Sequence, residues 1–512
     1  MRLYLLIILG CCFVICASSC RKDFDYSPSS GNLIFSKDTV FLDTVFTNIG
    51  SSTYSLKVYN RSKDDIAIPS IRLGTENNSN YRLNVDGVAG TQFVNVPLFA
   101  GDSLYIFIET TYDIAPTNLN EFLYVDDLIF DQGVNEQRIP LVTLVKDAIF
   151  LYPSTGSDGS KESLLLGLDE AGNELRIAGF VLEDSELSFT NEKPYVIYGY
   201  AGVAANKTLT IPAGARVHFH KDSGILVGTG GSIKINGLLS SDQELLENEV
   251  VFEGDRLEPE FSEVAGQWGT LWLAPGSVEN EIAYLTIRNA TVGLLVEGNP
   301  ESTIPTASIK NTQVYNSATV NLWGRNTSIA AENLVVGNAG TYSLYCNFGG
   351  SYSFLHSTIA NYWSTGFRTG PAVRVDSFIT NGDGNTEGAD LLRADFRNCI
   401  IDGNTARELA LATTQDYQFN YLFSDCLLKF TDTGGQFSND PLYDFENTDF
   451  YTNLYFNANA NFFNTVKNDF RIGPDSEAAG KGDPATALLV PLDVLGIDRT
   501  AQPALGAYQQ VP

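Results

Sequence analysis

The chain has 512 residues, of which 44% are hydrophobic and 18% charged, with 61 acidic against 32 basic side chains. That length exceeds what one hydrophobic core usually serves, so at least two folding units are expected. The composition is that of a globular protein and excludes a disordered chain or one embedded in a membrane. A formal net charge of −29 opposes nucleic-acid binding, because phosphate contacts need Lys and Arg. The same charge suits Ca²⁺ binding or simply keeps the protein soluble.

The N-terminus has the layout of a secretory signal peptide. Arg2 precedes an apolar run over 3–17, and two serines and Cys20 follow. About 15 apolar residues are too few for a transmembrane helix, which needs about 20. Because a Cys after two small residues resembles a bacterial lipobox, we expect residues 1–19 to be cleaved and Cys20 to be lipidated. The alternative is an ordinary cleaved signal with an incidental Cys.

Residues 20–30 form a tether whose start, Arg21-Lys22-Asp23-Phe24-Asp25, resembles the export signal of surface lipoproteins in the Bacteroidota. This resemblance implies a protein anchored to the bacterial outer membrane by its lipid and facing the cell exterior. A charged tether left in the periplasm is the alternative.

Residues 31–147 consist of short runs in which apolar and polar side chains alternate, such as 39–46, 54–59 and 104–108. Alternation with period 2 and turns about every 8–15 residues indicates an antiparallel sandwich of about seven strands. We therefore expect an Ig-like β-sandwich here. No His or Cys lies in this range, and its expected role is spacing or docking.

After a connecting segment, 148–194, the sequence repeats. Apolar runs end in Asn at intervals of 27, 22, 23 and 43 residues, at Asn289, Asn316, Asn338, Asn361 and Asn404. Such short strands cannot bury their apolar face alone, whereas stacked turns form a parallel β-solenoid. We expect each Asn to take the left-handed bend between strands and to hydrogen-bond the next Asn.

The repeat region resembles Bacteroidota lipoproteins with right-handed parallel β-helix repeats of the pectin-lyase-like fold. The resemblance rests on residues 211–220, 224–227, 232–237, 266–272 and 276–280, and on a closing segment over 468–508. It implies an all-β chain, with the Ig-like sandwich followed by a right-handed parallel β-helix over 195–440 and a C-terminal cap over 441–512. Because this fold hosts lyases, hydrolases, adhesins and inert scaffolds, it leaves the function open.

Arg393, Asp395 and Arg397 alternate with Ala394 and Phe396, so the three charged side chains share one face of a strand. In the lyases that the chain resembles, an Arg or Lys acts as base while acids hold Ca²⁺, which makes these three the candidate catalytic residues. An exposed ion-pair ladder explains the same pattern. Glycoside hydrolysis would need two carboxylates about 5–10 Å apart, and the sequence offers no recognisable pair.

A candidate calcium loop carries oxygen side chains at Asp383, Asn385, Glu387 and Asp390. Its spacing matches the first half of an EF-hand loop, but the Glu expected at the twelfth position is absent. A Ca²⁺ site and an ordinary loop inserted between turns are both compatible with it. A second metal candidate is the pair His218 and His220, which share a strand face but lack an evident third ligand.

Trp268 and Trp272 are four residues apart and are expected on the same face of a strand, with Trp323 and Trp363 on later turns. Exposed indoles would stack on sugar rings, and buried ones would fill the coil. The three Cys beyond residue 20 form no disulfide framework. Of these, Cys399 and Cys426 begin matching apolar runs 27 residues apart and are expected to stack as buried free thiols.

No Ser-His-Asp grouping, nucleophilic Cys or phosphate-binding Gly loop can be recognised. The sequence therefore favours a non-catalytic binding or scaffold protein that uses the long face of its solenoid. The expected partner is a polysaccharide or an outer-membrane protein, and no cofactor is expected apart from Ca²⁺. The alternatives are a polysaccharide lyase or glycoside hydrolase acting on acidic polysaccharide, and an adhesin.

Overall fold

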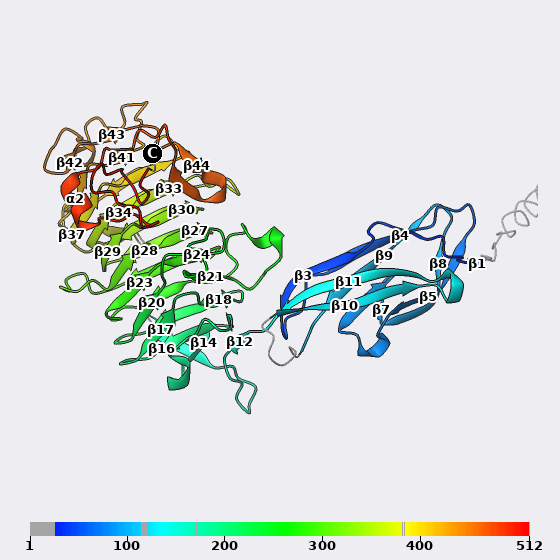
Figure 1. The fold of residues 1–512 in the computed structure, drawn as a ribbon. Coiled ribbons are helices and arrows are strands. Elements are labelled where there is room, and N and C mark those ends of the chain that lie inside the picture. The colour runs from blue at the N-terminus through cyan, green and yellow to red at the C-terminus, as the bar shows by residue number, and fades with distance from the viewer. Residues whose placement is uncertain (1–25, 114–120, 170, 381, 383, 511–512) are drawn as a thin grey trace, which may run out of the picture. The chain divides into compact units, whose positions relative to one another are not determined.

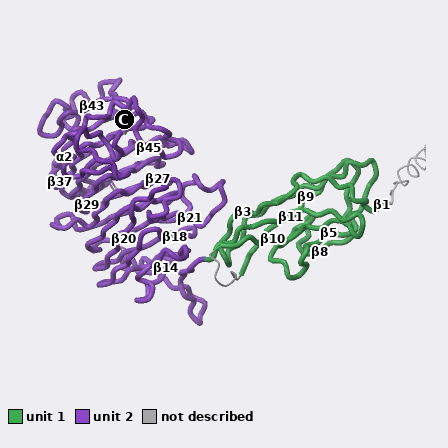
Figure 2. Tube along the Cα trace, viewed as in Figure 1, with its two compact units in different colours: residues 1–147 green, residues 148–512 purple. Residues whose placement is uncertain are grey.

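The computed structural model describes residues 26–113, 121–169, 171–380, 382 and 384–510. The chain divides into two compact units, residues 1–147 and 148–512 (Figures 1 and 2). Within the described residues, no helix is long and apolar enough to cross a membrane. The expected signal peptide and Cys20 lie outside the described residues.

The first unit is a sandwich of two sheets around one apolar core, which includes Leu56, Ile106 and Leu141. One sheet is mixed and contains β1 (Ser27–Pro28), β3 (Val40–Phe46), β5 (Ile66–Leu73), β8 (Gln92–Leu98), β10 (Glu121–Phe130) and β11 (Gln137–Lys146). The other is antiparallel and contains β2 (Ile34–Phe35), β4 (Tyr54–Tyr59), β6 (Tyr81–Val85), β7 (Val88–Gly90) and β9 (Ser103–Thr110). Two short 3₁₀ helices, η1 (Glu76–Asn78) and η2 (Gly133–Asn135), lie in its loops.

This sandwich differs in detail from the antiparallel, seven-stranded one expected. Two of its strand pairs are parallel, β3 with β11 and β1 with β5. Alternation in a sequence reports which face of a strand is buried but says nothing about the direction of its neighbour, so the parallel pairs could not be foreseen.

The second unit is a parallel β-helix built from three long sheets, and the chain passes from sheet I to sheet II to sheet III in each turn (Figure 1). Sheet I contains β13 (Ser163–Leu168), β14 (Glu174–Val181), β16 (Tyr200–Val203), β19 (Gly224–Val227), β22 (Leu271–Leu273), β25 (Val292–Glu297), β28 (Val320–Arg325), β31 (Tyr342–Asn347), β34 (Val373–Asp376) and β39 (Leu409–Ala412). Sheet II contains β17 (Thr208–Pro212), β20 (Ser232–Asn236), β23 (Asn280–Ala283), β26 (Ala307–Lys310), β29 (Ser328–Glu332), β32 (Gly350–Leu355), β37 (Leu391–Arg397), β40 (Leu422–Ser424) and β42 (Tyr451–Thr452).

Sheet III contains β12 (Ile149–Leu151), β15 (Tyr195–Ile197), β18 (Arg216–Phe219), β21 (Val250–Gly254), β24 (Leu285–Arg288), β27 (Gln313–Ser317), β30 (Val335–Ala339), β33 (Thr358–Asn361), β38 (Ile400–Gly403), β41 (Leu427–Leu428) and β43 (Tyr455–Phe456). Two hairpins, β35 (Phe378–Thr380) with β36 (Thr386–Gly388) and β44 (Phe462–Asn464) with β45 (Asp469–Ile472), lie outside the three sheets. The remaining helices are η3 (Asp184–Glu186), η4 (Pro259–Phe261), η5 (Pro441–Tyr443), η6 (Thr465–Lys467) and α2 (Pro484–Leu489). The predicted fold class, a sandwich followed by a β-helix in an all-β chain, is confirmed.

Like residues stack along the axis of the β-helix core. The fully buried rings of Phe354, Phe396 and Phe423 lie one above another, with centroids 5.0 and 4.6 Å apart. Parallel pairing extends beyond the range 195–440, because β12 pairs with β15 and β43 pairs with β41. These end strands have two or three residues each, which is too short for a sequence repeat to reveal.

Left-handed residues make the turns between the sheets, but in two series rather than one. In the expected series, Asn289, Asn316 and Asn338 have φ of 62°, 55° and 59°. Asn361 and Asn404 do not have positive φ, so the expected left-handed bend is wrong for these two. The second series lies between sheets II and III, and there Asn333 Nδ2 donates to Asn311 Oδ1 at 2.8 Å.

The expectation that the first series bonds Asn to Asn is therefore wrong. Asn316 Nδ2 donates to Glu263 at 2.5 Å and Asn338 Nδ2 to the carbonyl of Thr465 at 2.8 Å. The reason is that segments from elsewhere in the chain cover this series and take up its donors.

The C-terminal part of the chain packs on two different surfaces of the β-helix. Aromatic residues such as Tyr443 and Phe445 pack on the end of the β-helix core. Residues beyond 457 instead run over the outer face of sheet III, where Phe470 and Tyr508 bury Tyr315 and neighbouring apolar residues. The predicted cap thus closes the end of the β-helix and also covers one of its sides.

Candidate functional site

Arg393, Asp395 and Arg397 share the outer face of β37 and pair with one another. Asp395 Oδ2 lies 2.7 Å from Arg393 Nη2 and 3.5 Å from Arg397 Nη2. The residues opposite them on β32 are Ser351, Ser353 and Leu355. Because that strand provides no second carboxylate, the arrangement forms a local ion pair on the surface rather than a cluster of acids.

The candidate calcium loop is only partly described, because Asp383 lies outside the described residues. Glu387 is exposed on β36, and the Asp390 carboxylate accepts the backbone N–H of Gln418 at 2.8 Å. Across the described part of the chain, no group of three or more His, Cys, Asp and Glu side chains could hold a metal ion.

The two clustered histidines each have a protein partner. His218 is buried with Nδ1 3.2 Å from the carbonyl oxygen of Gly254. His220 Nδ1 lies 2.7 Å from Asp255 Oδ2, and its ring stacks on Tyr198 with centroids 4.5 Å apart. The hydrogen bond with Asp255 raises the pKa of His220 above its ordinary value.

Of the two tryptophans expected on one strand face, one points into the β-helix core and the other points outward. Trp268 is 1% exposed and stacks on Phe219 in the core, with centroids 4.3 Å apart. Trp272 is half-buried and faces outward from β22. The same-face prediction is wrong because β22 begins only at Leu271, so the alternation of a regular strand does not extend back to Trp268. The predicted free thiols are buried, including Cys399 and Cys426.

Sheet I carries a line of large side chains on its outer face, which we name the aromatic column. Backbone pairing aligns five residues on successive strands: Trp272, Leu295, Trp323, Tyr345 and Arg374. All five are half-buried. At about 4.8 Å per strand, the aromatic column is about 19 Å long and follows the β-helix axis.

Two carboxylates accept hydrogen bonds from three members of the aromatic column: Trp272, Tyr345 and Arg374. Glu297 accepts Trp272 Nε1–H at 2.7 Å and pairs with Arg325 at 3.2 Å. Asp376 accepts the hydroxyl of Tyr345 at 3.0 Å and Arg374 Nε–H at 2.8 Å. Burial and the neighbouring Asp376 raise the pKa of Tyr345, so its hydroxyl stays protonated and can donate.

Two rings of the aromatic column contact each other, and the neighbouring Tyr342 packs against one of them. Trp323 and Tyr345 are stacked with centroids 5.5 Å apart, and Tyr342 lies 4.8 Å from Tyr345. The guanidinium of Arg374 lies 5.9 Å from the centroids of both tyrosines. The result is a preordered, partly exposed aromatic surface flanked by charged side chains.

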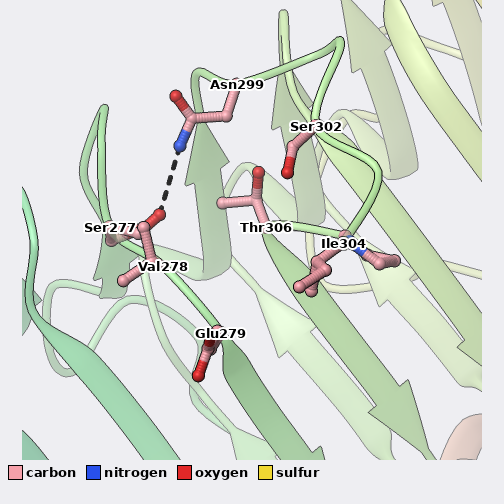
Figure 3. A pocket seen from close by; sticks show the side chains of 8 residues that line it. Ser277, Val278, Glu279, Asn299, Ser302, Ile304 and Thr306 are labelled. Atoms are coloured by element: carbon pink, nitrogen blue, oxygen red, sulfur yellow. Dashed lines mark hydrogen bonds between the residues drawn. The ribbon is translucent and has the colours of Figure 1, made fainter.

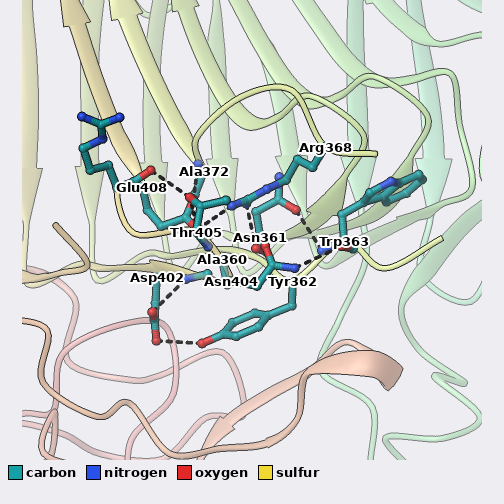
Figure 4. A network of polar contacts seen from close by, with 12 residues as sticks. Ala360, Asn361, Tyr362, Trp363, Arg368, Ala372, Asp402, Asn404, Thr405 and Glu408 are labelled. Atoms are coloured by element: carbon teal, nitrogen blue, oxygen red, sulfur yellow. Dashed lines mark hydrogen bonds and ion pairs between the residues drawn. The ribbon is translucent and has the colours of Figure 1, made fainter. Parts of the chain in front are cut away.

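A second polar network lies inside the loop between β33 and β34 (Figure 4). Arg368 Nη2 pairs with Glu408 Oε1 at 2.6 Å, and the two side chains are 4% and 0% exposed. Nearby, Asp402 accepts the hydroxyl of Tyr362 at 2.9 Å. Burial raises the pKa of both Glu408 and Asp402. Both acids are enclosed by protein partners, so this network holds the loop in place.

The two carboxylates beside the aromatic column, Glu297 and Asp376, do not meet the requirement for glycoside hydrolysis. Glu297 and Asp376 lie three strands apart in sheet I, which places them about 14 Å from each other, whereas hydrolysis needs about 5–10 Å. The Asp376 side chain is only 1% exposed. The cavity at the turn between β22 and β23, shown in Figure 3, is lined by Ser277, Asn299 and Ile304. Its volume of about 120 Å³ is well below that of ordinary ligand sites.

Neither a protein-family model nor a curated protein sequence matches the chain. Among solved structures, the catalytic unit of a GH87 α-1,3-glucanase from Streptomyces thermodiastaticus is similar over 73% of this chain and 79% of its own, at 9% identity and a TM-score of 0.27. A PapD-like domain of human CEP192 is similar over 25% of this chain and 94% of its own, at 11% identity and a TM-score of 0.16. The VesB protease of Vibrio cholerae is similar over 22% of this chain, at 11% identity and a TM-score of 0.16, and the chain spans 31% of that protease. Likeness at these levels says nothing about activity.

Sequence reasoning singled out Trp272 and Trp323 but missed Tyr345, Leu295 and the carboxylates that hold the rings. A signal was present in the repeat itself. Trp323 follows Asn316 by seven residues, and Tyr345 follows Asn338 by the same interval. Aligning the turns on their Asn residues therefore places these two rings one above the other.

Proposed function

We propose that this protein is a lipid-anchored surface protein that binds a glycan, without cleaving it, through the aromatic column on sheet I. The observation that carries this proposal is the alignment of Trp272, Trp323 and Tyr345 on the outer face of one sheet. Flat rings with large apolar faces stack on the apolar faces of pyranose rings. The side chains of Arg325 and Arg374 add hydrogen-bond donors beside them.

The state of the carboxylates supports binding rather than cleavage. Glu297 and Asp376 are each engaged by two or more protein donors. A general acid must be free to protonate a leaving group and needs a second carboxylate at a matching distance. Neither acid meets these conditions, and both instead orient the rings. Because the rings are fixed before binding, little side-chain entropy is lost when a glycan stacks on them.

Anchoring and display belong to the same proposal. The lipobox-like sequence before Cys20 and the charged residues after it support acylation and an outward-facing position. The sandwich would then act as a spacer between membrane and β-helix. Metabolic labelling with a fatty acid tests this: wild-type protein is expected to incorporate label, and Cys20→Ser to incorporate none. Label in Cys20→Ser would contradict anchoring at this residue.

Glycan binding is tested by affinity electrophoresis of the purified protein in gels that contain polysaccharides of different linkage and charge. Retardation by at least one polysaccharide is expected, and Trp323→Ala and Tyr345→Ala should each weaken it about tenfold or more, as loss of a central aromatic contact does. Arg393→Ala on sheet II is the matched surface control and should leave retardation unchanged. Release of oligosaccharides during the assay would instead identify an enzyme.

The accessory-subunit form of the proposal has its own test. A pull-down of the tagged protein from its native outer membrane in mild detergent would recover a stoichiometric membrane protein. If such a partner is recovered and no polysaccharide retards the protein, the protein acts as an accessory subunit and glycan binding is refuted.

A further inference from the structure

A cavity of about 340 Å³ lies where sheet I ends, beside its last strand, β39. Its walls come from residues 368–371 before β34, residues 405–407 and 409–410 around the start of β39, and two aromatic rings, Phe437 and Tyr443. Ligand sites start at volumes of about 300 Å³, so this cavity is large enough for a small molecule or a single sugar residue.

The aromatic column leads directly into this cavity. Arg374, its last member, pairs in register with Ala410, which lines the cavity. At the neighbouring position, the ring of Tyr342 lies so close to Gly370 that an added Cβ there would be 2.2 Å from the ring. Gly370 also lines the cavity, so the wall of the cavity and the aromatic column share a packed boundary.

Tyr443 and Phe437 block the way beyond the cavity. The Tyr443 hydroxyl accepts the N–H of Leu411 at 2.8 Å, a backbone donor on the free edge of β39. Tyr443 is 8% exposed and packs on Phe437, with ring centroids 4.6 Å apart. A chain lying along the aromatic column therefore meets a closed end here instead of continuing past the β-helix.

The cavity has one guanidinium that is available to a ligand. Arg368 is committed to Glu408 and nearly buried. Arg407 is exposed, donates to Gln436 Oε1 at 3.1 Å and lies over the ring of Phe437 at 4.8 Å. Among the described residues, no carboxylate oxygen lies within the 4.0 Å ion-pair distance of Arg407. In a chain with a net charge of −29, this leaves a local positive charge beside aromatic rings.

We propose that this cavity binds the end of a glycan chain and selects a terminal residue that carries a carboxylate, a uronic acid. The sugar ring would lie against Tyr443 and Phe437. Its carboxylate would accept a bidentate hydrogen bond from the guanidinium of Arg407. This inference rests on the glycan binding proposed above and adds to it the chain end and the charge of the terminal sugar.

The first experiment uses monosaccharide probes and the full chain. In saturation-transfer NMR titrations, D-glucuronate or D-galacturonate is expected to bind about tenfold or more tightly than D-glucose and D-galactose. Arg407→Gln should abolish this preference. Arg407→Lys should retain part of it, because lysine keeps the positive charge but cannot form the bidentate hydrogen bond of a guanidinium. Equal binding of acidic and neutral sugars, or a preference that survives Arg407→Gln, would overturn the proposal.

The second experiment tests recognition of chain ends. Polygalacturonate and its partial hydrolysate are compared at equal mass as competitors of uronate binding. Competition that rises with the number of chain ends is expected, whereas competition that depends on mass alone contradicts binding of the end. Polysaccharide retardation lost in Trp323→Ala but kept in Arg407→Gln separates the two proposals. If retardation is kept in Trp323→Ala as well, binding through the aromatic column is refuted. If no polysaccharide retards the wild-type protein, the proposed glycan-binding function fails too.

Discussion

Replacing Arg368 by Met should strongly destabilise the β-helix unit, and by an amount that depends on pH. The Arg368–Glu408 pair is almost completely buried, with side chains 4% and 0% exposed. Glu408 also accepts the backbone N–H groups of Thr405 at 2.8 Å and of Ala372 at 2.8 Å. Removing one partner of a buried pair leaves an uncompensated charge and costs about 3–5 kcal/mol. The exposed pair Arg393–Asp395 is the matched control, and Arg393→Met should cost about 0–1 kcal/mol.

The pH dependence follows from the pKa of Glu408. Burial raises this pKa above the ordinary value of 4.5, and Arg368 acts against that rise. Without Arg368 the folded-state pKa rises further, so the folded variant holds a proton that the unfolded chain has released. The stability of the variant is then fully present below the unfolded pKa and is lost as pH rises through the folded pKa. The destabilisation should therefore be smaller at about pH 5 than at about pH 8.

Denaturant unfolding followed by tryptophan fluorescence measures this in the intact protein. All four tryptophans lie in the second unit: Trp268, Trp272, Trp323 and Trp363. The fluorescence signal therefore reports the unfolding of that unit alone. In the double variant Arg368→Met with Glu408→Gln, much of the stability should return, because no buried charge is left unpaired. A loss below about 1 kcal/mol in Arg368→Met, or an equal loss at both pH values, would refute the reasoning.

Three further predictions concern the β-helix unit. Phe396→Ala removes the middle ring of a buried stack and should cost about 3–5 kcal/mol in the same unfolding assay, whereas a cost below about 1 kcal/mol would contradict a tightly packed core. Because Asp255 raises the pKa of His220, the pair stabilises the folded chain below the unfolded pKa of His and loses this effect as pH rises through the folded pKa. Wild-type protein should show this loss and His220→Gln should not, and identical pH profiles would disprove the role of the pair. An alkylating reagent should modify the three buried thiols only after unfolding, as peptide mass spectrometry would show: Cys346, Cys399 and Cys426. Labelling of these thiols in the native protein would contradict their burial.

The sequence was sufficient to predict the architecture but not the face that carries the candidate site. Repeated Asn residues revealed stacked turns, because only a few residue types tolerate a left-handed bend. They did not reveal how the chain folds back, so the partners of Asn316 and Asn338 on remote segments were not foreseen. Trp268 shows the same limit: its burial depends on where β22 begins, and a shift of strand start by a few residues changes which side of a wall a side chain faces.

Charge pattern was a weaker guide than strand register. The alternating residues Arg393, Asp395 and Arg397 were conspicuous in the sequence, yet they pair only among themselves. Tyr345 looked ordinary, and its place beside Trp323 follows from the pairing of β28 with β31. A site assembled from one residue per turn becomes visible only when the turns are aligned.

The segment that covers sheet III changes how the β-helix can fold. In a simple solenoid each turn contacts only its neighbours, so folding can spread from any point and the ends can fray independently. Here Tyr508 bonds to Gln313 and Gly506 N–H to the carbonyl of Asn398, which ties together turns far apart in the chain. These turns are synthesised before the segment that covers them. A chain cut short before that segment would expose the apolar side of sheet III, so burial of this side depends on a segment remote in the sequence.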